Sequence, residues 1–208
     1  MEHQSTLRTI TTVVLGTIAC NVALSQPQTG YYKVADLIDS NHVNVRAEPT
    51  ADSKDLGDIA SGSKPYEIIE TDPSGDWGRI LWLEATGWVA LRFMEPIQVE
   101  QLAKTEVPVG LVCAGTEPFW TFEIQSQQSA LLTTSESTQS LSVTNAESSR
   151  NYAAFPAAVE LQSDNYSAVS VLRRSQCADG MSEINYSWTV DIVKQPELEV
   201  LSGCCFLR

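Results

Sequence analysis

Histidine is scarce in this chain, and its scarcity excludes several kinds of active site. Only two histidines occur, His3 and His42, and neither lies in the second half of the sequence. A catalytic centre that pairs a cysteine or serine nucleophile with an imidazole base cannot be assembled in that half, and neither can a zinc site with a histidine ligand. No glycine-rich phosphate loop is present either. We therefore expect a protein that is not an enzyme and that carries no metal or other cofactor.

The sequence also lacks an apolar run long enough to span a bilayer. Residues 9–19 are apolar but fall short of the roughly 20 residues that a membrane-spanning helix needs, and they suit the h-region of a signal peptide. Small residues at 23 and 25 suit signal peptidase, so residues 1–25 are predicted to be a signal peptide. The alternative is an imperfect lipobox at residues 17–20, with a lipid anchor on Cys20. Both readings place the mature protein in the periplasm or outside the cell.

Positive charge is in short supply. The chain has 13 lysines and arginines against 26 aspartates and glutamates, a formal net charge of -13. A surface this negative repels phosphate backbones and anionic lipid headgroups. A nucleic-acid partner is therefore not expected.

Beyond the leader, cysteine is confined to the second half of the chain, at Cys113, Cys177, Cys204 and Cys205. In an oxidising compartment an even set of this kind predicts two disulfides. Adjacent cysteines rarely bond to each other, so Cys204 and Cys205 should reach separately to Cys113 and Cys177, in either pairing. A zinc site and a redox pair at the tail are rival readings, but the spacing lacks a Cys-x-x-Cys knuckle and a nearby histidine.

The arrangement of apolar residues predicts an all-β fold in two parts. Short β-rich segments separated by turn residues run from Tyr32 to the C-terminus, without strong helical periodicity. Residues 97–109 lose the alternation and are bracketed by prolines, so we predict a linker there. It separates a first domain, residues 33–96, from a cysteine-containing antiparallel β domain, residues 110–208.

The first domain carries an ordered set of motifs: VNVRAEP at residues 43–49, DWGRILW at 76–82 and TGWVALRFM at 86–94. Residues two apart in a strand share a face, so the two valines of the first motif should be buried together. In combination the motifs resemble the bacterial SH3 (SH3b) domain, an SH3-like β-barrel. The resemblance implies an extracytoplasmic, non-catalytic module that binds peptidoglycan or a wall-associated peptide.

Four side chains of this domain are candidates for a shallow recognition groove: Asn44, Arg46, Tyr66 and Trp77. Aromatic faces stack on sugars or peptides, while an amide and a guanidinium orient polar groups. An alternative role for Arg46 is to hold the loop that follows it by hydrogen bonds. Trp88 is expected in the core of the domain.

The second domain has three landmarks: CAGTEPFW at residues 113–120, CADGMSEINY at 177–186 and SGCC at 202–205. Together they resemble an uncharacterised family of bacterial envelope domains that share a Cys-x-Gly-Thr-Glu-Pro-Phe-Trp segment, a Cys-x-Asp-Gly-Met-Ser segment and a terminal Gly-Cys-Cys. This resemblance implies an envelope location and brings no established chemistry.

Two carboxylates in these landmarks, Glu117 and Asp179, leave an enzymatic alternative open. Placed together in a cleft, they could act as acid and base on a glycosidic bond. The other interpretation is that both carboxylates belong to turns and accept backbone N–H bonds. A protein-binding inhibitor or assembly factor is a further alternative to the wall-binding prediction.

Overall fold

The computed structural model describes residues 29–36, 42–62, 64–83, 85–151 and 154–207. The predicted signal peptide, residues 1–25 with Cys20, lies outside the described residues. Apart from one short 3-10 helix, every regular element in these ranges is a β-strand, which confirms the predicted all-β class. No helix among them is long and apolar enough to cross a membrane.

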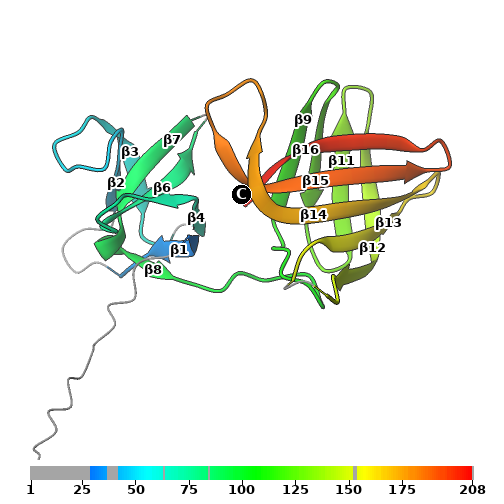
Figure 1. Cartoon of the computed structure of the whole chain (residues 1–208), viewed down its shortest axis with the longest axis horizontal. Helices are drawn as coiled ribbons and strands as arrows, with labels where there is room; N and C mark the ends of the chain where they lie inside the picture. Colours follow the sequence, from blue (N-terminus) through cyan, green and yellow to red (C-terminus); the bar gives the residue numbers. More distant parts are fainter. Residues whose placement is uncertain (1–28, 37–41, 63, 84, 152–153, 208) are drawn as a thin grey trace, which may run out of the picture.

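The strands form two units side by side (Figure 1). We call residues 30–96 the N-terminal unit; its elements are β1 (Gly30–Val34), β2 (His42–Arg46), β3 (Asp55–Ala60), β4 (Tyr66–Ile68), β5 (Glu70–Thr71), β6 (Trp77–Trp82), β7 (Ala85–Ala90), η1 (Leu91–Phe93) and β8 (Met94–Pro96). They make a three-stranded sheet, β4-β1-β8, and a five-stranded sheet, β3-β2-β7-β6-β5.

We call residues 111–207 the C-terminal barrel; its strands are β9 (Leu111–Thr116), β10 (Phe119–Ile124), β11 (Ser129–Thr134), β12 (Thr138–Ser148), β13 (Ala157–Gln162), β14 (Ser167–Ala178), β15 (Asn185–Gln195) and β16 (Glu199–Leu207). Each strand pairs antiparallel with the next, and β9 closes the barrel between β16 and β10. Closure leaves no free sheet edge.

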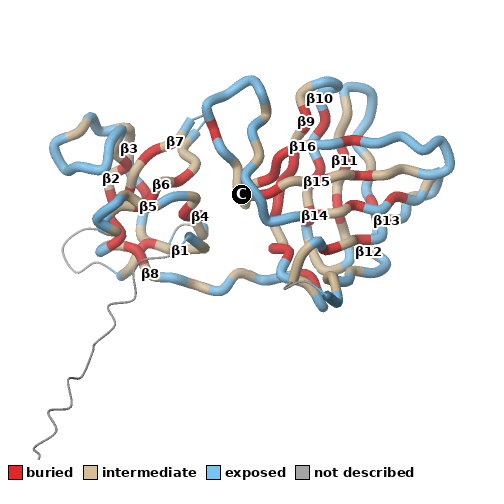
Figure 2. Tube along the Cα trace, viewed as in Figure 1, coloured by how far each residue is buried: buried red, intermediate tan, exposed pale blue. Residues whose placement is uncertain are grey.

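Alternation along the strands builds the core of each unit, as the burial colours in Figure 2 show. In the N-terminal unit Val43 and Val45 are both buried, which confirms their predicted shared face. Trp88 differs from expectation: its neighbours Gly87 and Val89 are buried, whereas Trp88 points to the opposite face and is half-buried. There its ring centroid lies 6.0 Å from the guanidinium of Arg79.

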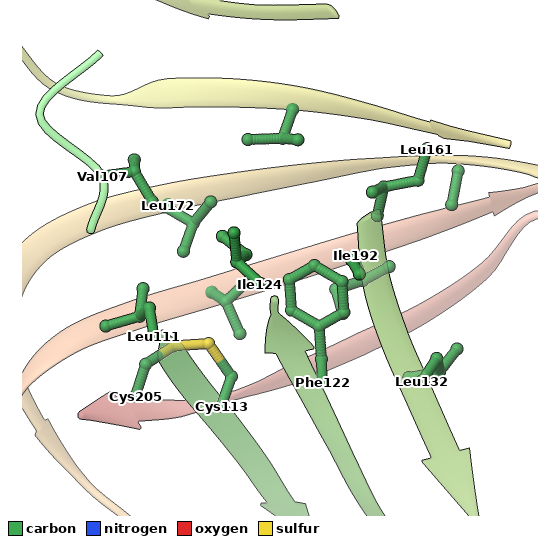
Figure 3. Packing of buried hydrophobic residues seen from close by; sticks show 14 of the residues in the cluster. Val107, Leu111, Cys113, Phe122, Ile124, Leu132, Leu161, Leu172, Ile192 and Cys205 are labelled. Atoms are coloured by element: carbon green, nitrogen blue, oxygen red, sulfur yellow. A yellow bond between two sulfur atoms is a disulfide. The ribbon is translucent and has the colours of Figure 1, made fainter. Parts of the chain in front are cut away.

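The two disulfides are Cys113–Cys205 and Cys177–Cys204, so the adjacent cysteines do bond to separate partners. Side chains of consecutive strand residues point to opposite faces. Cys205 therefore points into the barrel, where Figure 3 shows its bond to Cys113 beside Leu111 and Phe122. Its neighbour Cys204 points outward and fastens β16 to the end of β14.

Two glycines of the cysteine landmarks make room for a tryptophan. Gly115 faces Trp120 across β9 and β10, and a methyl group on Gly115 would lie 2.2 Å from the indole Nε1 atom. On β16, a methyl group on Gly203 would lie 2.2 Å from the backbone oxygen of Ala114 and 2.9 Å from Trp120. A side chain at either glycine would therefore meet Trp120, and at Gly203 it would also meet the backbone of the neighbouring strand.

The segment predicted as a linker, residues 97–109, belongs largely to the barrel. Leu102 and Val107 are buried in the barrel core, at 1% and 0% exposure. The N–H of Val109 donates to the oxygen of Glu100, and the N–H of Ile97 donates to the oxygen of Tyr31 in the N-terminal unit. Only residues 98 and 99 lie between these two attachments.

Candidate functional site at the junction of the two units

A row of inward-facing residues crosses the barrel where it meets the N-terminal unit. The strand register places Cys113 beside Cys205, Cys205 beside Trp188, and Trp188 beside Arg174. Residues directly opposite each other in neighbouring strands point to the same face of the sheet. Arg174 therefore continues the inward row, whereas the preceding residue, Arg173, points outward and pairs with Asp191 at 2.8 Å.

Glu67 on β4 meets this row from the N-terminal unit. Figure 1 shows β4 facing the end of the barrel at which the chain terminates. The Glu67 side chain is only 4% exposed, and its carboxylate lies 3.9 Å from the guanidinium of Arg174. The same guanidinium lies 5.9 Å from the ring centroid of Tyr31 and 5.8 Å from that of Trp188. Arg174, whose side chain is 37% exposed, thus lies near groups of both units.

The polar atoms in this junction are poorly satisfied. Within the described residues, neither oxygen of Glu67 accepts a hydrogen bond of good geometry, and the Tyr31 hydroxyl and the Trp188 Nε1 atom also lack one. Weak hydrogen-bonding contacts from Ser187, Trp188 and the backbone of Leu207 lower the pKa of the Glu67 carboxylate, but by less than burial raises it. A buried polar group without a good partner costs free energy, so the docked arrangement carries a local penalty at this point.

Burial dominates the ionisation of both acidic groups. Loss of water raises the pKa of Glu67 above its ordinary value, and the positive charge of Arg174 offsets only part of that rise. Burial likewise raises the pKa of Tyr31, with the Glu67 charge acting in the same direction. The junction therefore favours a neutral Glu67 more strongly than water does.

Two cavities flank the Glu67–Arg174 contact, and both are lined by both units. The arginine cavity, of about 240 Å³, is mostly polar and is lined by Thr29, Ile69, Glu70, Arg79, Arg174, Ser175, Gln176, Asn185, Tyr186 and Ser187. The aromatic cavity, of about 420 Å³, is more apolar and is lined by Lys64, Pro65, Tyr66, Glu67, Leu81, Trp82, Leu83, Phe206 and Leu207. Both follow the same stretch of chain, since the aromatic cavity uses residues 64–67 and the arginine cavity uses residues 69 and 70.

No family model, curated protein or solved structure matches the chain. The resemblances carried by the motifs therefore stay predictions.

The structure does not bring the four predicted binding residues into one groove. Asn44 donates to Asp55 and Asp58 at 2.9 and 3.0 Å, and Arg46 lies 3.6 Å from Asp55. Arg46 also donates to the backbone oxygen of Ser53 at 3.1 Å, which gives it the loop-holding role named as its alternative.

The two predicted aromatic residues lie in different sheets. Tyr66 is on β4, in the three-stranded sheet, and lines the aromatic cavity. Trp77 is half-buried at the start of β6, in the five-stranded sheet, where its backbone N–H donates to Asp72 at 2.8 Å. Of the four predicted residues, Tyr66 is the one placed at the junction.

The carboxylates of the enzymatic alternative have separate surroundings. Asp179 accepts backbone N–H bonds from Met181 at 2.9 Å and Ser182 at 2.8 Å. These bonds lower the pKa of Asp179, and the bond from the backbone of Ser182 has the largest effect. A lowered pKa suits a carboxylate that caps a turn better than one that acts as a general acid. Glu117 is exposed in the turn between β9 and β10. The cavity beside Asp179 is lined by Thr116 rather than by the Glu117 carboxylate.

Sequence reasoning missed the residues that form the junction: Glu67, Arg79, Arg174, Trp82 and Phe206. In the structure β4 buries two consecutive residues, Glu67 and Ile68, a feature that the sequence alone does not show. Such a strand has both faces covered, which requires a second unit beside it.

Proposed function

We propose that this protein is an exported, non-catalytic envelope protein that binds peptidoglycan or a wall-associated peptide at the junction of its two units. The observation that carries the proposal is the pair of cavities along β4 and β5, one lined by aromatic and aliphatic groups and one by arginines. The two intramolecular disulfides are consistent with an oxidising location outside the cytoplasm.

The aromatic cavity has the composition that sugar rings and small apolar peptide residues require. Tyr66, Trp82 and Phe206 contribute ring surface from both units. Rings of this kind offer a flat apolar face together with a polar edge, which suits the mixed surface of a sugar or a peptide. Arginines nearby supply charged donors to the same ligand.

Leu83 gives the proposal a test that does not disturb the core. This residue lines the aromatic cavity, is 87% exposed, and has a positive φ of 55° at the tip of the β6–β7 hairpin. Asparagine tolerates that backbone conformation, so Leu83→Asn removes apolar surface without straining the turn. Leu198→Asn is a matched control, because Leu198 is 65% exposed, has a φ of 56° and lies in the β15–β16 turn.

The measurement is retention of the mature protein by purified sacculi. We expect Leu83→Asn to weaken retention by about tenfold, because a tenfold change corresponds to the free energy gained by burying most of one leucine side chain. Leu198→Asn should leave retention unchanged. Trp77→Ala distinguishes binding at the junction from binding at the groove predicted from the sequence, because Trp77 lines neither junction cavity. Equal retention of the wild type and Leu83→Asn, or no retention of any form, contradicts the proposal.

A further inference from the structure

The arginine cavity departs from the charge of the whole molecule. The chain carries twice as many acidic as basic residues, yet among the described residues the cavity is lined by two arginines and one carboxylate, that of Glu70. Its other polar side chains are neutral hydroxyls and amides from Thr29, Ser175, Gln176, Asn185, Tyr186 and Ser187. A positive recess in a negative surface attracts anions locally.

The guanidinium of Arg79 is held in place before any ligand arrives. Arg79 donates from Nε to Thr86 at 3.0 Å and from Nη1 to Glu70 at 3.0 Å, and it lies against the ring of Trp88. The guanidinium of Arg174 lies 5.9 Å from the ring centroid of Tyr31 and 5.8 Å from that of Trp188, and its side chain is 37% exposed. Side chains that are already ordered lose little further freedom on binding.

The charge of Arg174 is only partly cancelled within the protein. Its acidic partner is Glu67, at 3.9 Å, a distance at which no close bidentate pair forms. Burial favours the neutral form of Glu67, which weakens that pair further. Arg79, by contrast, already has a close partner in Glu70, so Arg174 is the stronger anchor for an external anion.

We propose that the arginine cavity receives the terminal carboxylate of a short peptide, with Arg174 as its main ion partner and Arg79 beside it. This inference rests on the proposed function and names the part of a wall peptide that the junction recognises. The planar guanidinium matches a carboxylate with two parallel hydrogen bonds. The side-chain amides of Gln176 and Asn185 can each donate to and accept from the adjoining peptide bond. The volume of about 240 Å³ suits one or two terminal residues rather than a glycan strand.

The first test uses the unmodified mature protein and three probes: N-acetyl-D-alanyl-D-alanine, its C-terminal amide, and acetate. Binding is followed by NMR titration of the backbone amides. We expect the acid to bind at least tenfold more tightly than the amide, which keeps the peptide groups but loses the charge, and to shift the amides of residues 174–176 and 185–187. Acetate should bind more weakly than the dipeptide because it lacks the peptide bond.

The second test uses two adjacent arginines of β14. Arg174→Gln should weaken binding of the acid by about tenfold, whereas Arg173→Gln, which removes the same charge from the outward-facing pair with Asp191, should leave it unchanged. Arg79→Gln, in the N-terminal unit, should weaken binding of the acid as well. The test therefore does not depend on whether Arg174→Gln alters the contact between the two units.

Three outcomes overturn the inference: equal binding of acid and amide, equal binding of acetate and dipeptide, or no binding of the acid. The result is separable from that of the sacculus experiment. Retention by sacculi that depends on Leu83, combined with equal binding of acid and amide, refutes the carboxylate site while leaving wall binding in place. Selective binding of the acid without sacculus retention supports the carboxylate site and refutes wall binding.

Discussion

Replacing Glu67 by glutamine should stabilise the protein at neutral pH, an unusual outcome for a buried charged residue. The side chain is 4% exposed, its oxygens lack good hydrogen bonds within the described residues, and its cationic partner stands 3.9 Å away. Loss of hydration outweighs the attraction of Arg174, and the pKa of Glu67 is raised. Glutamine keeps the shape of the neutral form without the penalty of burying a charge.

The sign of the pH dependence follows from proton linkage. The unfolded chain releases the Glu67 proton near pH 4.3, whereas the folded protein holds it to higher pH. The stabilising contribution of this group is therefore complete below about pH 4.3 and is lost as the pH rises toward the folded pKa, at about 1.4 kcal/mol for each pH unit of that interval. The phenol of Tyr31, which interacts with Glu67, has its own pKa raised by burial and stays neutral throughout this range.

The assay is thermal unfolding of wild type and Glu67→Gln between pH 4 and pH 8. The variant should melt above the wild type at pH 7, because it does not bear the cost of burying the charged carboxylate. Near pH 4 the two proteins should melt together. Glu48→Gln, an exposed site in the same unit, is the control. A variant that melts below the wild type at pH 7, or a difference that is the same at every pH, refutes the reasoning.

Two further predictions concern the barrel. Gly203→Ala should cost about 1–3 kcal/mol, because the added methyl group meets the backbone oxygen of the neighbouring strand at 2.2 Å. Gly30→Ala is its control, since no described atom lies within 4 Å of the added methyl group there; equal urea midpoints for both variants would contradict the packing argument. Replacing Cys113 and Cys205 together by alanine should cost about 4–5 kcal/mol, since that disulfide closes a loop of 92 residues; a loss below about 1 kcal/mol in urea unfolding would mean that the unfolded chain is restrained by other means.

Local patterns were enough to predict the fold class and to predict that Cys204 and Cys205 bond to separate partners. Val43 and Val45 alternate with polar residues, and burial of one face is the direct physical consequence. The adjacent Cys204 and Cys205 likewise had to point to opposite faces once they lay in a strand. Which partner each one takes depends on the register of β16 with β9, and register is a tertiary property.

The junction could not be predicted in this way, because its residues acquire their role only when two units meet. Arg173 and Arg174 are chemically identical neighbours, and only the path of β14 past the barrel end gives one of them a buried carboxylate as partner. Glu67 lies on the side of β4 that a single domain would leave in water. The apolar residues Leu102 and Val107 did carry a signal that their segment is packed, but the flanking prolines favoured a linker.

The short connection between the units sets how far they can part. Ile97 is held by the N-terminal unit and Glu100 by the barrel, so the three peptide steps between them span at most about 10 Å. Breaking every contact at the junction would consequently produce a hinge opening about residues 98 and 99, with neither half drifting away. With a connection this short, each unit stays at a high effective concentration for the other, and their association does not depend on protein dilution.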